Sequence, residues 1–363
     1  MTTLVTGANG FIGSSVARQL VAAGYGVRAL VRPGAPRDNL AGLPLAIVEG
    51  DLTDPDSLAA ALSGCRFLIH IAADYRLWVP DPDRMYRTNL DGTRNLMQAA
   101  QEAGVKQIVY TSSVATLGIH SDGVAGDETT PAGPGDLIGP YKHSKFLAER
   151  EVTQQIHDDG LPAVIVHPST PVGPRDSRPT PTGRMILDAA RGKMPAFVDT
   201  GLNLVHVDDV AWGHMAALEH GRIGEHYILG GENYTLKQML TEVAELTGRK
   251  PPRVRLPHGL VLPIAYLAEA WARVSGREPL ATVTGVRLSR KPMFFSSAKA
   301  REELGYRPRP ARHALADAIR WFLDQGLLPA TIPRPKAGDG EAPTVPTETT
   351  QEPETPSQGE TRP

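Results

Sequence analysis

The stretch Thr6-Gly7-Ala8-Asn9-Gly10-Phe11-Ile12-Gly13 determines the fold class, because it joins a short β-branched run at residues 3–6 to a helical pattern at residues 14–20. Its first glycine permits a tight turn, its second lets the backbone approach a pyrophosphate, and its third lets the helix pack closely on the strand. The spacing is one residue longer than the G-x-G-x-x-G fingerprint. A glycine triplet alone is ordinary turn chemistry, but in this position it predicts a dinucleotide site. We expect contacts to the dinucleotide from Gly7, Asn9, Gly10, Phe11, Ile12 and Gly13.

Short apolar runs alternate with longer helical patterns from residue 1 to about residue 170, which is typical of βαβ units and a parallel sheet. We predict an α/β fold with a doubly wound Rossmann sheet in residues 1–170 and further core segments within residues 200–230. Residues 171–332 are expected to form mostly a smaller C-terminal substrate-binding domain. Strands are predicted at residues 3–6, 27–31, 46–49, 67–71, 107–111 and 163–167. Helices of the second half are predicted near residues 236–247, 260–274 and 298–304.

Two segments differ in composition from the rest. Residues 333–363 consist almost entirely of Pro, Thr, Glu, Gly and Gln, which cannot bury enough apolar surface to fold, so a disordered tail is predicted. Residues 259–271 are the most apolar stretch, but they are shorter than a membrane span and contain Pro263 and Glu269. We predict no transmembrane segment here. A buried helix is favoured over an interfacial helix or a lid, because an interfacial helix needs a strongly basic opposite face.

The 363 residues carry a formal net charge of -2, with 41% hydrophobic and 21% charged residues, as in average globular proteins. This charge offers no basic field for nucleic acid. The only cysteine, Cys65, cannot form an intramolecular disulfide, which fits a reducing compartment. The first residues lack the charged, apolar and small-residue regions of a secretory signal. We therefore expect a cytoplasmic protein without nucleic-acid partners.

Residues after the second, third and fourth predicted strands indicate how the dinucleotide is bound. Arg32 ends the second strand, where an NAD enzyme often carries an acid for the ribose hydroxyl. A guanidinium there could hold the extra phosphate of NADP, helped by Arg28 or Arg37, so NADP is slightly favoured over NAD. Asp51, after the third strand, could bind the adenine edge or cap the following helix. Further cofactor contacts are expected from Leu52, Ala72 and Ala73.

A second group of motifs indicates acid–base chemistry. Pro140-Tyr141-Lys142-His143-Ser144-Lys145 begins a helix, in which Tyr141 and Lys145 are four residues apart and share one face. A nearby ammonium lowers the pKa of a phenol, which makes tyrosine a usable acid or base. The fifth predicted strand ends in Thr111-Ser112-Ser113, at the sheet edge where open α/β folds bind ligands. Ser113 can therefore orient a reacting substrate oxygen.

Together these motifs resemble the NAD-dependent epimerase/dehydratase group of the extended short-chain dehydrogenase/reductase family, over residues 1 to about 327. The resemblance implies a triad of Ser113, Tyr141 and Lys145 beside a nicotinamide ring, with Tyr141 and Lys145 also contacting the cofactor. It implies a supporting role for Asn89, which could instead be a helix cap. A narrower resemblance is to the hopanoid-associated sugar epimerase group, which is similar to dihydroflavonol reductases and 3β-hydroxysteroid dehydrogenases. This narrower resemblance is carried by residues 72–78, 168–175 and 203–209.

The narrower resemblance implies further contacts. Pro168 and Ser169 would lie beside the nicotinamide, although turn chemistry explains them equally well. Tyr75 is a candidate substrate contact. Arg175 could bind a substrate diphosphate, or it could form an ion pair with Asp176 or another neighbour.

Three polar residues of the last motif, His206, Asp208 and Asp209, could suggest a metal site. We expect them instead to cap the following helix and to fasten the two domains, because no further ligands occur at metal-site spacing. No metal is predicted.

The predicted chemistry is reversible hydride transfer at a secondary alcohol or ketone, in which Tyr141 exchanges the proton. An epimerase performs the transfer twice, whereas a reductase performs it once and releases oxidised cofactor. Val114-Ala115 replaces the Asp-Glu pair that dehydratases carry after the active-site hydroxyl, which disfavours dehydration. The substrate could be a nucleotide sugar, a polycyclic lipid or a flavonoid-like ketone, and the family implies a homodimer. A non-catalytic dinucleotide sensor is a further alternative, against which the Tyr-Lys pair argues.

Overall fold

The computed structural model describes residues 1–76, 78–79, 81–120, 123–133, 135–275, 279 and 282–336. Its centre is a parallel sheet with the strand order β10-β6-β5-β4-β1-β2-β3. The strands are β1 (Thr2–Thr6), β2 (Gly26–Val31), β3 (Ala46–Glu49), β4 (Phe67–His70), β5 (Gln107–Thr111), β6 (Ala163–Pro168) and β10 (His226–Leu229). This sheet confirms the predicted doubly wound α/β fold. The first six strands coincide with the predicted runs to within one residue, and β10 comes from beyond residue 200.

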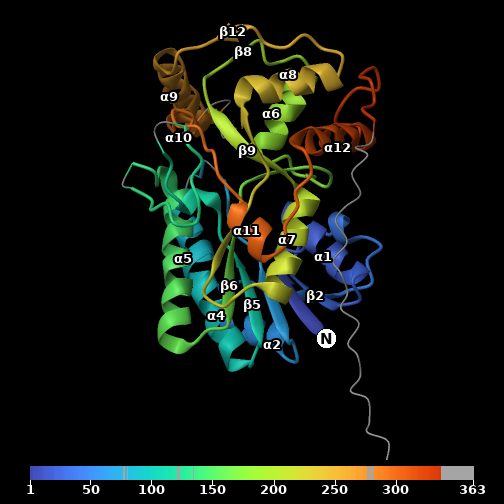
Figure 1. Ribbon diagram of the computed structural model, residues 1–363, viewed down its shortest axis with the longest axis vertical. Helices are drawn as coiled ribbons and strands as arrows, with labels where there is room; N and C mark the ends of the chain where they lie inside the picture. The colour runs from blue at the N-terminus through green and yellow to red at the C-terminus, as the bar shows by residue number, and fades with distance from the viewer. Residues whose placement is uncertain are drawn as a thin grey trace, which may run out of the picture.

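Helices cover both faces of this sheet (Figure 1). One face carries α1 (Phe11–Ala22), α7 (Val207–His220) and α11 (Ala298–Glu303), and the other carries α2 (Pro55–Leu62), α4 (Gly92–Glu102) and α5 (Gly139–Asp159). Successive strand residues point to opposite faces, so Val5 and Val109 pack in the α1 and α7 layer, while Leu4 and Ile108 pack in the other. Burial on both faces explains why these strands are continuous apolar runs.

A smaller layer, which we call the cap, lies beyond the carboxyl ends of the strands (Figure 1). Its sheet has the order β11-β9-β7, with β7 parallel and β11 antiparallel to β9. A short parallel pair, β8 with β12, completes its strands. The strands are β7 (Thr170–Val172), β8 (Ala196–Phe197), β9 (Gly201–His206), β11 (Glu232–Thr235) and β12 (Val254–Arg255). Helices α6 (Pro181–Ala190), α8 (Leu236–Leu246) and α12 (Ala311–Asp324) enclose an apolar core with this sheet.

The outer edge of the cap is formed by α9 (His258–Ser275) and α10 (Val283–Leu288) (Figure 1). Among the described residues of α9, only Ala265 and Ala272 are buried, and Ala265 packs with Val283 and Val286 of α10. This small contact leaves most of the large apolar side chains of α9 exposed, so the prediction of a buried helix is wrong. In the described part of the chain, no helix is both long and apolar enough to span a bilayer.

The tail predicted for residues 333–363 lies largely outside the described residues, which end at Lys336. Its first residues are placed against the cap. Arg334 pairs with Asp324 of α12 at 2.7 Å, and Pro333 lies beside Gly248. Residues 333–336 therefore belong to the folded part of the chain.

Candidate active site

The glycine turn between β1 and α1 leaves no room for side chains. Gly7 has a φ of +66°, and a Cβ at this position would lie 2.9 Å from Ala72 N. A Cβ on Gly13 would lie 2.0 Å from the carbonyl oxygen of Gly7. Gly10 is the N-cap of α1 and offers no side chain to the N–H groups of the first turn. These N–H groups and the helix dipole form an anion site of the kind that binds a pyrophosphate.

A buried network of hydrogen-bonded polar side chains lies beneath the turn, and sequence analysis missed it. Thr6 Oγ1 accepts hydrogen bonds from Ile71 N and Ala72 N, each at 3.1 Å, and contacts His70 Nδ1 at 2.7 Å. His70 Nε2 contacts Thr93 Oγ1 at 3.1 Å. Burial lowers the pKa of His70 to about 3, so its ring is neutral. The only sequence signal for this network of polar side chains is a polar residue at the end of each of two apolar strands.

Arg32 and Asp51 lie close together after β2 and β3. Burial alone would raise the pKa of the Asp51 carboxyl, but hydrogen bonds from Thr53 and the charge of Arg32 outweigh burial and lower it. Asp51 Oδ1 accepts from Thr53 N at 2.9 Å and from Thr53 Oγ1 at 2.7 Å. The cap of α2 is Asp54, whose side chain accepts from Ser57 N. The alternative that Asp51 caps this helix is therefore wrong.

The two arginines expected to assist Arg32 are engaged elsewhere. Arg28 donates to the carbonyl oxygens of Ala61 and Ser63, at 2.6 and 2.7 Å, where α2 ends. Its expected role in holding a phosphate is therefore wrong. Arg37 pairs with Glu49, at the end of β3.

Two further residues of the predicted nucleotide site contact neighbouring loops and helices. Asn9 donates through Nδ2 to the carbonyl oxygen of Pro36 at 2.9 Å, so its side chain ties the glycine turn to the loop after β2. Leu52 is buried against the start of α4, where a Cβ on Gly92 would lie 2.7 Å from the Leu52 Cβ. Both residues therefore shape the nucleotide-binding edge.

Ser113, Tyr141 and Lys145 come together where β5 ends and α5 begins. Ser113 lies two residues beyond the end of β5 at Thr111, and a hydrogen bond joins its hydroxyl to that of Tyr141. Lys145 lies one turn further along α5 and is buried. Its Nζ donates to Tyr110 Oη at 3.0 Å and to the carbonyl oxygen of Thr111 at 2.8 Å.

The pKa of Tyr141 differs from the sequence prediction. Burial raises it, and the hydrogen bond with Ser113 lowers it by less. Lys145 is not among the groups that lower it, because the ammonium is held by Tyr110 and Thr111, so the predicted lowering is wrong for this arrangement. Tyr141 is therefore protonated at neutral pH and able to act as an acid. Burial also lowers the pKa of Lys145 to about 8.

Glu149 lies one turn beyond Lys145 on α5, and its charge acts on the Lys145 ammonium. The carboxylate opposes the effect of burial by raising the pKa of Lys145. It accepts hydrogen bonds from Ser112 Oγ and, at 2.8 Å, from Thr116 Oγ1. Sequence analysis missed Glu149, although its spacing of four residues from Lys145 places both on one helix face.

Two stacked histidines adjoin Glu149. His167 Nδ1 lies 3.2 Å from the carbonyl oxygen of Ser113, and its Nε2 lies 2.9 Å from His226 Nδ1. Burial, reinforced by His167, lowers the pKa of His226 to about 4. Ligand-type atoms of Glu149, His167 and His226 lie within 4.8 Å of one another. The direct contact between the rings makes this group a hydrogen-bonded network next to the triad.

Asn89 lies in a π-helical turn, η2 (Arg87–Asp91), between α3 (Pro82–Tyr86) and α4. Its Oδ1 accepts from Asp74 N at 2.7 Å, and its Nδ2 donates to Asp74 O at 2.9 Å and to Ser144 Oγ at 3.0 Å. The side chain thereby ties the loop after β4 to α5. The alternative of a helix cap is wrong, because Asp81 caps α3 and the helical path continues through η2 into α4.

The loop after β4 brings Tyr75 next to the triad. Ala72 and Ala73 begin this loop, and Ala72 N is fixed to Thr6. Tyr75 is 46% exposed, and it lies close enough to Tyr141 to raise the pKa of that residue. Its placement is compatible with a contact to a substrate.

Pro168 ends β6, and Ser169 follows it at the carboxyl edge of the sheet. Ser169 N donates to the carbonyl oxygen of Leu229 at 3.3 Å. Its buried Oγ has no hydrogen-bond partner within the described residues. Buried polar groups are normally hydrogen-bonded, so this hydroxyl is suited to a ligand at the strand end.

Comparison with known proteins identifies the family. The sequence model of the NAD dependent epimerase/dehydratase family matches residues 3–230. The chain belongs to this family. It is accordingly an NAD(P)-dependent enzyme of the extended short-chain dehydrogenase/reductase type, as the sequence predicts.

Members with high similarity include reductase-like and sterol-related proteins. A candidate dihydroflavonol 4-reductase of Synechocystis sp. is 44% identical over 328 residues, covering 89% of this chain and 95% of that protein. Sterol demethylase protein B of Methylococcus capsulatus is 38% identical over 332 residues, covering 90% of this chain and 100% of that protein. The crystal structure of gox2253 is 57% identical with a TM-score of 0.82, covering 90% of this chain and 99% of that one.

Arg175 has a structural position in this member of the epimerase/dehydratase family. Its guanidinium donates to Ser15 Oγ at 3.0 Å and pairs with Asp208, which joins α1 to the start of α7. The alternative of an ion pair therefore applies, with Asp208 in place of Asp176. Because these contacts engage the guanidinium within the protein, it is not free to bind a substrate diphosphate in this arrangement.

The polar residues at the start of α7 act as the sequence predicts. His206 caps the helix by accepting from Asp208 N at 3.0 Å. Asp209 is buried and pairs with Arg309 at 2.7 Å, and the backbone N–H of Arg309 donates to it as well. The cap and the nucleotide-binding half are thereby fastened together.

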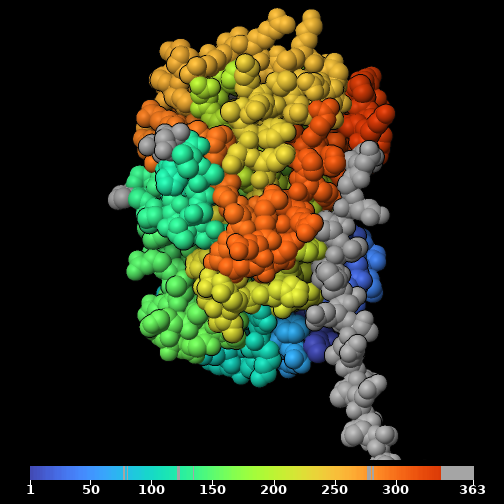
Figure 2. Space-filling model, viewed as in Figure 1, coloured from blue at the N-terminus to red at the C-terminus, as the bar shows by residue number. Residues whose placement is uncertain are grey.

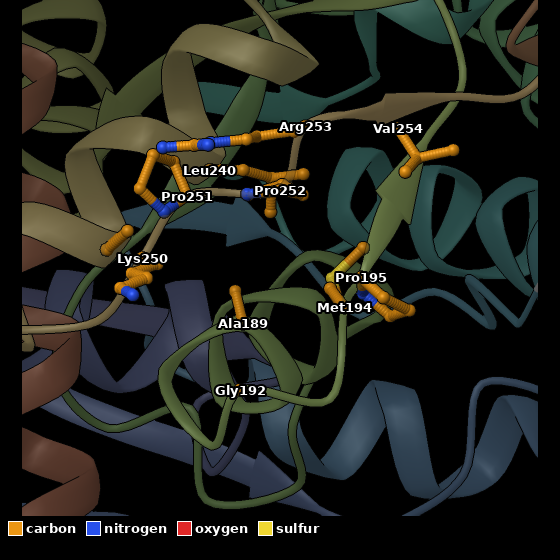
Figure 3. A pocket seen from close by; sticks show the side chains of 11 residues that line it. Ala189, Gly192, Met194, Pro195, Leu240, Lys250, Pro251, Pro252, Arg253 and Val254 are labelled. Carbon is orange, nitrogen blue, oxygen red and sulfur yellow. The ribbon is translucent and has the colours of Figure 1, made fainter.

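Two hollows open on the cap of this family member. One, of about 210 Å³, is lined by residues of α6, α8 and the segments 192–195 and 250–254, and its lining contains no Ser, Tyr, Asp or Glu (Figure 3). It includes none of the predicted site residues. The other, of about 400 Å³, reaches Lys142, the neighbour of Tyr141. Its lining likewise includes no residue of the triad, and because Lys142 adjoins Tyr141 in sequence we take it as the candidate ligand cavity.

Proposed function

We propose that the protein transfers hydride reversibly between NADP(H) and a secondary alcohol or ketone of an apolar, polycyclic substrate. The observation that carries this proposal is the meeting of Ser113, Tyr141 and Lys145 at the carboxyl end of β5. Open α/β sheets bind their ligands at this edge.

The residues present fit a dinucleotide. The pyrophosphate would lie at the glycine turn, where Gly7 and Gly13 leave no room for a Cβ. The unpartnered Ser169 hydroxyl would bind the nicotinamide amide, beside Pro168. When bound, the nicotinamide ring supplies or accepts the hydride.

The triad supplies the proton chemistry. Ser113 and Tyr141 hold the substrate oxygen between their hydroxyls, and Tyr141 gives its proton to that oxygen during reduction. Burial keeps Tyr141 protonated before the step, so it can donate a proton, and the Lys145 ammonium would hold the ribose of the cofactor. Glu149 keeps Lys145 charged, and Asn89 holds the loop that carries Tyr75 against α5.

Arg32 supports a preference for NADP. It lies after β2 without the acid that would bind a ribose hydroxyl at that position, and a guanidinium binds a phosphate through paired hydrogen bonds. Asp51 would contact the adenine edge beside it.

The substrate class rests on two observations. The two relatives compared above are named for a flavonoid-type reductase and for sterol demethylation, both of which concern polycyclic molecules. Four apolar side chains line the cavity beside Lys142, among charged ones, and they suit part of such a body.

A second candidate is an epimerase, as in the hopanoid-associated sugar epimerase group that the sequence resembles. The family description, which names epimerases, favours it. An epimerase would keep its cofactor bound and return the hydride to the opposite face of a sugar.

The deciding experiment identifies the nucleotide. Freshly purified protein is denatured, and the released nucleotide is quantified per chain by mass spectrometry. We expect little captive nucleotide, together with uptake of NADPH in preference to NADH and oxidation of NADPH by polycyclic ketones. Stoichiometric NAD that is never released during turnover would contradict the reductase and favour the epimerase.

Tyr141→Phe is the matched test of the chemistry. It should lower turnover by about a hundredfold to ten-thousandfold, because the proton donor is lost, while NADPH still binds. If neither the wild-type chain nor this variant turns over any ketone, alcohol or nucleotide sugar although both bind the cofactor, the protein is a sensor and the proposal fails.

A further inference from the structure

Lys142 carries a buried ammonium that the triad does not use. The residue is 3% exposed, and its Nζ has no hydrogen-bond partner within the described residues. Burial lowers its pKa to about 8, against the opposing charge of Asp136. A buried ammonium without a partner costs stability, so its presence next to Tyr141 in α5 calls for a function.

Lys142 faces the cavity of about 400 Å³ that lies between the start of α5, α9 and α10. Apolar side chains form much of the wall: Ile119, Ile138, Leu262 and Leu288. Three more cations line it: Arg287, Arg290 and Lys291. The single acid of the lining, Asp136, is already paired with Lys291 at 2.7 Å. The cavity is therefore apolar along its walls and positively charged, and Lys142 is its unpaired buried cation.

We propose that this cavity binds the anionic group of an amphiphilic ligand, a carboxylate, sulfate or phosphate on an apolar body, with Lys142 as its counter-ion. If this ligand is the substrate of the enzyme, the inference rests on the proposed function. The binding site itself does not depend on turnover. An anion beside Lys142 supplies the partner that the ammonium lacks, and the apolar walls take the rest of the molecule.

A matched pair of steroids tests the site in the full-length protein. Dehydroepiandrosterone sulfate and dehydroepiandrosterone share a polycyclic ketone body and differ in the anionic group. We expect the wild-type chain to bind the sulfate about tenfold more tightly or better, and Lys142→Met to lose that preference. Lys193→Met, at an exposed position, is the control and should keep it. A preference that survives Lys142→Met, or its absence in the wild-type chain, would overturn the proposal.

Stability provides a second readout. Because the pKa of Lys142 is lower in the folded chain than in the unfolded chain, the cost of the ammonium is present below about pH 8 and disappears as the pH rises through the unfolded value. Lys142→Met should therefore raise the thermal midpoint at neutral pH, with a smaller gain in strong alkali. A loss of stability would show that the ammonium serves the fold, and would sink the proposal. Binding of the steroid sulfate without turnover would support this site and contradict only the proposed function.

The exposed face of α9 carries a second inference independently. Its large apolar side chains recur at spacings of four, three, four and three residues, which places them in one stripe, and each is between 58% and 82% exposed. The stripe consists of Leu260, Ile264, Leu267, Trp271 and Val274. A contiguous apolar stripe of this kind marks an interaction surface.

The surroundings of the stripe are strongly basic. The described residues of 249–275 and 282–291 contain eight Lys and Arg residues and one Glu residue, in a chain whose net charge is -2. The basic segment 249–255 and α9 both lie at the end of the molecule that the cap forms, where amber-coloured atoms cover the upper surface (Figure 2). An apolar stripe flanked by cations is complementary to an anionic lipid surface.

Other occupants fit this surface less well. A second copy would bring two surfaces of the same charge together, which is unfavourable. Residues 337–363 are acidic, but they contain one aliphatic side chain beyond alanine and proline, Val345, and no aromatic residue, so they cannot cover the stripe. We infer that α9 and the basic segment beside it bind the surface of an anionic phospholipid bilayer without crossing it.

Vesicle flotation tests this inference with the full-length chain. Vesicles of phosphatidylcholine with phosphatidylglycerol should carry the protein, whereas vesicles of phosphatidylcholine alone should carry at least about tenfold less. Leu267→Gln with Trp271→Gln should abolish flotation. The control pair, Ile47→Gln with Ile223→Gln, changes exposed apolar residues of the nucleotide-binding half and should float like the wild-type chain.

Charge variants and a measurement of the oligomeric state in solution complete the test. Lys250→Gln with Arg253→Gln should weaken binding about tenfold, and Lys106→Gln with Arg150→Gln should not. A wild-type chain that stays off the anionic vesicles would overturn the inference. The inference would also be overturned if the Leu267→Gln, Trp271→Gln variant stayed on the vesicles. The same holds if the only effect of these two substitutions were to convert a dimer in solution to a monomer.

Discussion

Lys145 and Glu149 show how a short helical spacing and a tertiary contact act together on one group. The ammonium is buried, which lowers its pKa to about 8, and the carboxylate one turn later opposes that shift. Lys145 is therefore charged below about pH 8 and loses its proton as the pH rises through that value. The ammonium is the form in which Lys145 would hold the cofactor, so activity in the reductive direction should fall across this range.

Glu149→Gln should move the alkaline limb of the pH profile of kcat/KM to lower pH, by about one unit. The amide removes the negative charge but keeps an oxygen that accepts from Ser112 and Thr116. Glu102→Gln, at an exposed position of α4, is the control and should leave the limb in place. An unchanged limb in Glu149→Gln would show that Lys145 does not set the pH dependence.

Residues linked by local spacing could be predicted, and residues linked only through the fold could not. Tyr141 and Lys145 share a helix face, and Ser113 lies just beyond a strand end, so the sequence indicates all three. The Tyr110 hydroxyl that accepts a hydrogen bond from the Lys145 ammonium lies 35 residues away, and no sequence pattern predicts that contact. The same applies to Arg28, whose position in the sequence suggests a phosphate ligand but whose partners lie at the end of α2.

At the scale of elements, the turn between β1 and α1 depends on an approach that excludes even a methyl group. A Cβ on Gly13 would overlap the carbonyl oxygen of Gly7, which is backbone and cannot rotate away. Any side chain at Gly13 must therefore push α1 off the strand and displace the N–H groups that face the pyrophosphate.

Gly13→Ala should lower the free energy of unfolding by about 1–3 kcal/mol and weaken NADPH binding. Gly259→Ala is the matched control, since a Cβ there meets no atom within 4 Å. In the control, stability should stay the same or rise slightly, because alanine favours the helix. Urea unfolding and cofactor titration measure both effects, and equal behaviour of the two variants would contradict the steric argument.

The accuracy of the sequence prediction differs between elements for a physical reason. The first six strands of the large sheet are apolar on both faces, so each is visible as a continuous run. The strands of the cap are short, and β7 even contains Pro171, so nothing in their composition separates them from turns. The periodicity of α9 predicts an apolar face, but it does not say whether a neighbour covers that face.

At the scale of the whole molecule, one buried ion pair connects the two halves. Asp209 of α7 has no exposed side-chain surface and is bound by both the guanidinium and the backbone N–H of Arg309, which precedes α12. Removing the guanidinium leaves a buried carboxylate with one of its partners missing.

Arg309→Met should therefore lower the free energy of unfolding by about 3 kcal/mol. Arg312→Gln, three residues later, removes an exposed pair with Glu242 and Glu245 and should cost at most about 1 kcal/mol. Urea unfolding of both variants, monitored at the same wavelength, measures the difference. Similar losses in the two would show that burial does not set the strength of the pair.

The path of the chain has a consequence for how the protein unfolds. After β6 the chain enters the cap, returns for α7 and β10, enters the cap again, comes back once more for α11, and enters the cap a last time for α12 within the described residues. No single cut separates the two halves, so neither can be released as an intact fragment. We expect one cooperative calorimetric transition in which the calorimetric and van't Hoff enthalpies agree, whereas two domains joined by a single linker can melt in two steps.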